Sequence, residues 1–105
     1  MDVVCSAPEY ESYTVVDGRM HVKFAIPADG SPLMQSDDVK GFNVASTDGS
    51  WHVAKARVVA FDCVEVWSDE VVMPIAVRYA WADKPVCNLR SVDGLPVNPF
   101  RSDKW

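Results

Sequence analysis

Residues 19–26 read Arg-Met-His-Val-Lys-Phe-Ala-Ile, and this stretch decides the fold. Every second residue from Met20 to Ile26 is apolar, while the residues between them are mostly polar. In an extended chain successive side chains point to opposite faces, so this period places the apolar residues on one face. The pattern predicts a β-strand over 19–26 with one face in a core and the other in water.

Turn signals and similar alternating runs lie on both sides of this strand. Asp17-Gly18 precedes it, and Asp48-Gly49 separates two later runs. A short Asp-Gly turn between such runs predicts a β-hairpin. Prolines interrupt the few stretches that would tolerate a helix. We therefore expect strands at 2–6, 10–16, 19–26, 39–46, 51–60, 62–67 and 73–81, with a loop at 33–38.

This spacing favours one all-β domain. Short strands at intervals of about ten residues are typical of an antiparallel β-sandwich. A chain of 105 residues buries roughly 65% of its unfolded surface, which is enough for one core. Hydrophobic residues make up 49% of the chain and charged residues 24%, which is the composition of a globular protein. We expect a single antiparallel β-sandwich over 1–105, of immunoglobulin-like character, ending in an ordered tail over 82–105.

Charge and composition disfavour nucleic acids, membranes and metal ions as partners. The net charge of −5 disfavours a phosphate-binding surface, so we expect no nucleic-acid partner. No apolar run approaches the roughly 18 residues of a membrane span, and the first residues lack the pattern of a signal peptide, so we expect no membrane partner. The cysteines form no Cys-x-x-Cys pair, which gives no indication of a zinc site or a disulfide framework. We expect no metal or cofactor, and free, mostly buried thiols with one disulfide at most among Cys5, Cys63 and Cys87.

The tail combines motifs with residues that interrupt regular structure. Its three prolines and Gly94 exclude a further strand or a helix, so side chains must hold it in place. The motifs are Val-Arg-Tyr-Ala-Trp-Ala-Asp at 77–83, Pro85, Asn88-Leu89, Gly94-Leu95-Pro96 and Pro99-Phe100-Arg101-Ser102-Asp103.

This order of motifs resembles the carboxy-terminal end of sialate O-acetylesterases and related SGNH-type carbohydrate esterases, with Ser102 in place of the usual threonine. Gly41-Phe42 and the strand at 20–26 extend the resemblance more faintly over most of the chain. In that family the catalytic serine lies in a Gly-Asp-Ser block and the histidine in an Asp-x-x-His block, both in a separate α/β module. This sequence contains neither block, so no catalytic residue is carried over.

The resemblance therefore implies a non-catalytic β domain, cut from the carboxy-terminal end of a larger esterase. Its partner would be the catalytic module of the same parent chain. The parent would remove O-acetyl groups from sialic acid or a similar sugar. It would do so in an exported setting, which could be periplasmic, extracellular or lysosomal.

One short stretch nevertheless holds the residue types of a serine hydrolase. Ser50 and His52 follow Asp48, and such an enzyme needs a serine beside a base that a carboxylate orients, with donors for the oxyanion. Because this stretch falls on a predicted hairpin, turn chemistry is the favoured interpretation. A small stand-alone esterase that uses Ser50 and His52 is kept as an alternative.

Polar residues of the tail are candidates for structural contacts. Arg78 lies between two alanines on its strand face, which leaves room for its guanidinium to reach a carboxylate such as Asp83 or Asp103. Covered irregular backbone needs side-chain hydrogen bonds. We therefore expect a network of Arg78, Asp83, Asn88, Arg101 and Asp103. We expect the surface that contacts the catalytic module to comprise Trp81, Asp83, Asn88, Phe100, Arg101 and Trp105.

Sugar binding by exposed aromatic residues is the alternative function. Flat rings offer apolar faces to pyranose rings while polar neighbours orient the hydroxyls. Trp51 and Trp67 lie near the ends of expected strands, where a ring can stay accessible. The alternative is therefore a carbohydrate-binding module that uses Trp51 and Trp67.

Overall fold

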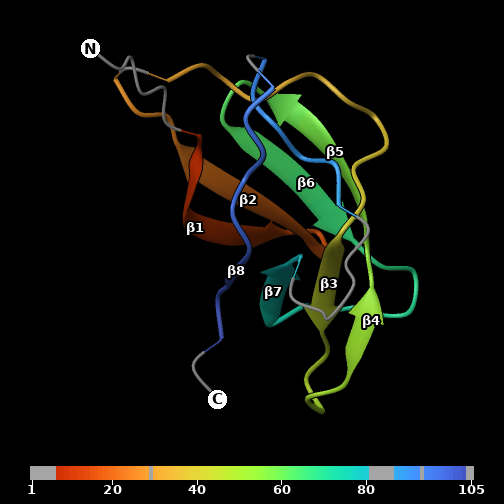
Figure 1. Ribbon diagram of the computed structural model, residues 1–105. Coiled ribbons are helices and arrows are strands. Elements are labelled where there is room, and N and C mark those ends of the chain that lie inside the picture. Colours follow the sequence, from red (N-terminus) through yellow and green to blue (C-terminus); the bar gives the residue numbers. More distant parts are fainter. Residues whose placement is uncertain (1–6, 29, 81–86, 93, 104–105) are drawn as a thin grey trace.

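The structure is a computed structural model that describes residues 7–28, 30–80, 87–92 and 94–103. The strands in these residues form two four-stranded antiparallel sheets (Figure 1). The first sheet has the order β1 (Glu9–Val16), β2 (Arg19–Ala25), β6 (Cys63–Trp67) and β5 (Lys55–Ala60). The second has the order β4 (Trp51–Val53), β3 (Phe42–Ala45), β7 (Ala76–Tyr79) and β8 (Phe100–Arg101).

The two sheets confirm the predicted all-β sandwich, whereas its immunoglobulin-like character stays a prediction. Asp17-Gly18 joins β1 to β2, and the turn at Asp48-Gly49 joins β3 to β4, so both predicted hairpins are confirmed. The strand expected at 2–6 lies outside the described residues. Within those residues no helix is long and apolar enough to cross a membrane.

The single strand expected at 51–60 is wrong, because the chain changes sheets within it. β4 belongs to the second sheet and β5 to the first, and Ala54 lies between them with its N–H bonded to Phe42 O at 2.9 Å. Side chains still alternate between exposed and buried from Val53 to Val58. The crossing therefore leaves the sequence period intact, and periodicity alone could not reveal it.

Two further strands are shorter than expected for reasons of backbone geometry. β3 begins at Phe42 because Gly41 has φ +109, where a Cβ would also lie 2.8 Å from the Cβ of Cys87. β7 ends at Tyr79 because Ala80 adopts φ +56, outside the extended region. The two turns lie beside each other, since Ala80 N donates to Gly41 O at 2.9 Å.

The expectation that the tail contains no strand is also wrong. Phe100 and Arg101 form β8 and pair with Tyr79 and Arg78 of β7. Pro99 precedes this strand, at a position where its missing N–H removes no ladder bond. The C-terminal segment consequently runs along the edge of the second sheet (Figure 1).

The core lies between the two sheets and is filled by alternating residues from both. Valines of β2, β3, β6 and β7 are fully buried, together with three large rings and Met20. Burying such side chains is the main source of stability in a domain of this size. These residues are Met20, Val22, Phe24, Phe42, Val44, Val64, Val66, Val77 and Tyr79.

Candidate functional site

An ion pair ties the end of the tail to β7. Arg78 donates two hydrogen bonds to Asp103, from Nε to Oδ1 at 3.1 Å and from Nη2 to Oδ2 at 2.8 Å. The Asp103 side chain is 0% exposed and that of Arg78 is 22% exposed. Hydrogen bonds from Arg78 lower the pKa of Asp103, and the same contact raises the pKa of Arg78. Because this pair is bidentate and shielded from water, it holds the tail more firmly than an exposed pair would.

Trp51 extends this contact across the outer face of the second sheet. The Arg78 guanidinium carbon lies 3.9 Å from the centre of the Trp51 ring, a cation–π contact. Ala45 pairs with both Trp51 and Ala76, and the two alanines are 0% and 1% exposed although they lie outside the core cluster. Trp51 and Arg78 therefore share the outer face with these two buried alanines and shield them from water.

Four more side-chain hydrogen bonds hold the tail along its length. Tyr79 Oη accepts a hydrogen bond from Leu89 N at 2.8 Å, and burial raises the pKa of Tyr79 to about 12. Asn88 bridges to the loop before β3, with Oδ1 accepting from Lys40 N at 2.7 Å and Nδ2 donating to Asp38 O at 3.1 Å. Ser102 Oγ accepts from Val77 N at 2.9 Å. The tail is thus fixed at both ends of its described part.

Phe100 is the apolar anchor of the tail. Its ring stacks on Tyr10 at 4.6 Å between centroids and lies 5.9 Å from the ring of Tyr79. Phe24 and Phe42 meet it edge-on at 5.7 and 6.1 Å. One tail residue therefore links the amino-terminal strand of the first sheet to the second sheet.

These contacts change the interpretation of the expected contact surface. Asn88 and Phe100 are engaged within the domain, so their side chains serve its own packing first. Arg101 is exposed on β8. Trp81, Asp83 and Trp105 lie outside the described residues, so the pairing of Arg78 with Asp83 and the docking of the two tryptophans stay predictions.

Trp51 and Trp67 do not come together. Trp51 lies on the outer face of the second sheet, and Trp67 lies with Glu65 on the outer face of the first. An arginine covers one face of each ring, Arg78 for Trp51 and Arg19 for Trp67, the latter at 4.3 Å. The two tryptophans consequently cannot form one sugar platform.

The Ser50–His52 pair acquires a third member that the sequence did not indicate. Ser50 Oγ lies 3.1 Å from His52 Nε2, and His52 Nδ1 lies 3.3 Å from Glu70 Oε2. This order of serine, histidine and carboxylate is that of a catalytic triad. Glu70 belongs to a turn between β6 and β7, so no spacing signal in the sequence could have connected it with Ser50.

Other contacts of Ser50 argue against catalysis. Its hydroxyl donates to Asp48 Oδ1 at 2.6 Å, so the proton points toward Asp48. The N–H groups that could serve an oxyanion are engaged, Gly49 N with Ser46 O and Ser50 N with Asp48 Oδ1. Bonds from Ser46 and Ser50 lower the pKa of Asp48, which keeps a negative charge where an oxyanion would form. The turn interpretation therefore accounts for these contacts better than an esterase site does.

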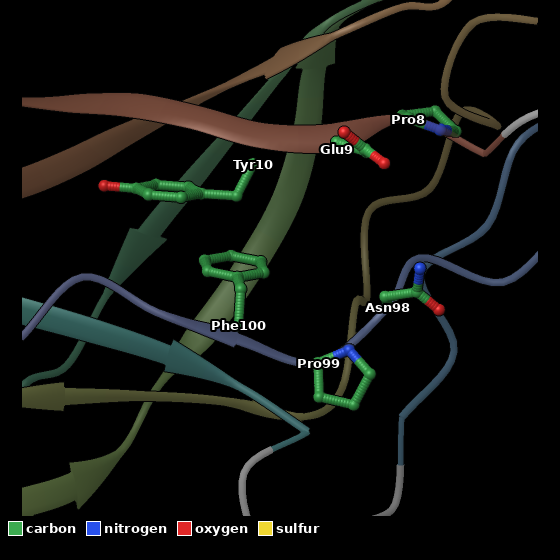
Figure 2. Close-up of a pocket in the computed structure, with 6 residues that line it drawn as sticks. All are labelled: Pro8, Glu9, Tyr10, Asn98, Pro99 and Phe100. Carbon is green, nitrogen blue, oxygen red and sulfur yellow. The ribbon is translucent and has the colours of Figure 1, made fainter.

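A small pocket lies where the two ends of the described chain meet (Figure 2). It has a volume of 230 Å³. Pro8 and Glu9 face Asn98 and Pro99 across its opening, and the stacked rings of Tyr10 and Phe100 close one end. Sequence reasoning missed this site because its two walls are about ninety residues apart in the chain and each wall alone carries no motif.

Metal and thiol chemistry find little support in the described part of the chain. Among its residues no three His, Cys, Asp or Glu side chains gather as metal ligands would. Cys63 is half-buried and Cys87 is exposed, and both are free thiols, so the expectation of mostly buried cysteines is wrong for Cys87. Cys5 lies outside the described residues. Burial raises the pKa of Cys63, which makes its thiol less reactive.

Comparison with solved structures relates this chain to a carbohydrate acetylesterase. No family model and no curated protein sequence matches this chain. The crystal structure of XAC1771, described as a carbohydrate acetylesterase from Xanthomonas citri, is 37% identical over 99% of this chain, with a TM-score of 0.87. The chain is related to a carbohydrate esterase. It covers 24% of the length of that enzyme, so the matched region is a small part of it.

Proposed function

We propose that this chain is a non-catalytic accessory domain of a larger carbohydrate esterase. The observation that carries the proposal is the extent of the match, because 99% of this chain corresponds to 24% of a carbohydrate acetylesterase. A region of that size leaves most of the esterase for a separate catalytic domain. The tail motifs further favour a sialate O-acetylesterase-like parent, with an SGNH-type catalytic domain and this domain at its carboxy-terminal end.

The mechanical role of such a domain would be to support the catalytic one. Ser50, the candidate nucleophile, has no free oxyanion donors beside it, since its own N–H and that of Gly49 are engaged in the turn. Two packed sheets with a buried core and a tail bonded to β7 make a compact support. A support of this kind suits a buttress that fixes the wall of a neighbouring cleft.

Acetate release from O-acetylated sialic acid tests the proposal. The parent esterase is compared with a variant that lacks residues 1–105, and the isolated chain is assayed in parallel. We expect no hydrolysis by the isolated chain. We expect the shortened parent to lose soluble yield and thermal stability, while its folded fraction keeps both kcat and KM.

Two controls make the result decisive. Ser50→Ala in the intact parent should leave the rate unchanged, because the turn serine has no catalytic part. A shortened parent that stays fully stable but shows a KM raised severalfold would overturn the buttress role, since the domain would then touch substrate. Hydrolysis by the isolated chain that disappears with Ser50→Ala would establish the stand-alone esterase instead.

A further inference from the structure

The edge strand β1 carries an inner face that the second sheet leaves partly uncovered. Tyr13 pairs with Val22 of β2. Val15 pairs with Met20, so both β1 side chains lie on the side of the first sheet that faces the core. Val22 and Met20 are 0% exposed, whereas Tyr13 is half-buried and Val15 is 36% exposed. The core face of the first sheet therefore continues past β2 without a full cover.

The connection between β6 and β7 adds more apolar surface beside this face. Tyr13 Oη donates to Ile75 O at 3.0 Å, and a Cβ on Gly18 would lie 2.8 Å from Val72 O. These two contacts place the connection alongside the second half of β1. Val72 is 87% exposed and Met73 is 53% exposed. The residues of this surface, named the β1 patch, are Tyr13, Val15, Val72, Met73 and Ile75.

The β1 patch contains no charged side chain. Residues 71–77 form an uninterrupted apolar run in a chain of which 24% is charged. Single exposed apolar residues are normal on a protein surface, but a contiguous group of them marks an interaction site. The core of a protein interface is likewise depleted of charge. A partner that covers the patch must therefore offer apolar surface of its own.

A second group of exposed apolar residues lies at the opposite end of the first sheet. Phe61 lies in the turn between β5 and β6, and its carbonyl accepts from Leu33 N at 2.9 Å. Met34 and Val92 lie beside it, on segments bridged through Leu33 and Ser91. These residues belong to turns and loops. The β1 patch, by contrast, continues a core face, so a partner placed there would extend the core itself.

We propose that the β1 patch is the surface through which this domain packs against the catalytic domain of its parent esterase. The inference rests on the proposed function and deepens it, because it names the face that makes the contact. The match covers 24% of XAC1771, which leaves most of such an enzyme to lie against this domain. A domain in the same chain has a high effective concentration, so it can keep an apolar face covered permanently.

Methionine oxidation tests the proposal in the parent esterase and in the isolated chain. Hydrogen peroxide converts accessible methionine into its sulfoxide, and peptide mass spectrometry gives the rate at each site. Met73 is 53% exposed in the β1 patch, Met34 is 45% exposed at the opposite end, and Met20 is 0% exposed in the core. We expect Met73 to oxidise about fivefold or more slowly in the parent than in the isolated chain, with Met34 unchanged. Resistance of Met20 in both samples shows that the domain is folded in each.

Three results would overturn the proposal. Equal rates at Met73 in the parent and in the isolated chain would show that the catalytic domain leaves the β1 patch open. Slower oxidation of Met34 alone would place the contact at the opposite end of the sheet. A Met73 rate that falls in the isolated chain as its concentration rises would assign the patch to a second copy.

A pair of matched substitutions gives an independent measurement. Val72 is 87% exposed and Val53, on β4 of the second sheet, is 83% exposed. A charge in a covered apolar interface loses its water, so Val72→Asp should lower the melting temperature of the parent by about 4 °C or more relative to Val53→Asp. In the isolated chain the two variants should melt within about 1 °C of each other. Equal melting temperatures of the two variants in the parent would contradict the proposal.

This result is separable from the test of the buttress role. A reactive Met73, in a parent that loses stability when residues 1–105 are removed, would leave the buttress standing and move its contact to another face. A protected Met73, in a parent whose shortened form stays stable with a raised KM, would keep the docking surface and remove the buttress role. Neither oxidation nor melting depends on acetate release.

Discussion

The first sheet and the tail are held in place by different interactions. β1, β2, β6 and β5 pair through backbone ladders that shift register between Tyr10 and Ser12 and between Val58 and Ala60, and their alternating apolar residues fill one side of the core. The described tail pairs as a strand only at Phe100 and Arg101. Along the rest of its length isolated backbone bonds, such as those from Met34 N to Arg90 O and from Val92 N to Pro32 O, act together with separate side-chain anchors, so the expectation that side chains alone hold the tail is wrong.

This difference predicts how each region responds to substitution. A ladder distributes its stabilisation over many similar contacts, so substitution of one exposed side chain on it lowers the free energy of unfolding only slightly. An anchor concentrates stabilisation in one side chain with a buried partner, and removing it leaves a cavity or an unpaired polar group. Single substitutions should therefore cost more in the tail than on the solvent face of the first sheet.

The largest effect is expected for Phe100→Ala. The ring touches four other aromatic rings that come from both sheets, so its removal opens a cavity between them. We expect a loss of about 4 kcal/mol in the free energy of unfolding, measured by urea denaturation at neutral pH. Val53→Ala is the control, since Val53 is 83% exposed and should change stability by less than about 0.5 kcal/mol. Similar small losses for both variants would show that Phe100 does not anchor the tail.

Arg78→Ala should have the next largest effect. It leaves the Asp103 carboxylate buried without its partner and uncovers the alanines beneath Trp51, so we expect a loss of about 3 kcal/mol at pH 7. An unchanged unfolding midpoint would contradict the role of this pair. In a double-mutant cycle, Arg78→Ala combined with Asp103→Ala should cost less than the sum of the two single changes.

The pH dependence of this loss follows from the lowered pKa of Asp103. A carboxyl group whose pKa is lower in the folded state contributes stability above its unfolded pKa of about 3.9, and that contribution disappears as pH falls through the folded pKa. The difference between wild type and Arg78→Ala should therefore be constant near neutral pH and shrink below about pH 4. A difference that grows in acid would be inconsistent with an ionised Asp103.

The smallest effect is expected on the first sheet, for Glu65→Gln. Glu65 accepts hydrogen bonds from Arg19, His21 and Arg57; burial opposes its charge, but these three bonds lower its pKa overall. Its partners are 42%, 35% and 49% exposed, so water and salt weaken the attraction. We expect a loss of about 1 kcal/mol by urea denaturation, smaller still in high salt. A loss as large as that of Arg78→Ala would remove the distinction between ladder and anchor.

Local patterns predicted the parts of the fold that depend on neighbouring residues. The alternation from Met20 to Phe24 and the Asp-Gly turns predicted two hairpins and a sandwich, because strand period and turn geometry are properties of a few adjacent residues. They could not predict the crossing at Ala54, where the alternation continues while hydrogen-bonding partners change. They also missed β8, since Phe100 pairs only because β7 presents a free edge.

The candidate sites can be divided in the same way, into residues that local motifs indicated and contacts that they missed. Motifs in the tail pointed to Arg78 and Asp103 as polar residues in need of partners, and the structure brings these two together. Glu70 beside His52 and the walls of the Pro8–Pro99 pocket had no local signal. The sequence by itself determined the all-β class, most strands and the two hairpin turns, and its tail motifs pointed to the carbohydrate esterases to which the comparison relates this chain. The tertiary structure decided which distant side chains meet, because packing two sheets and returning the tail to β7 requires the whole chain to be folded.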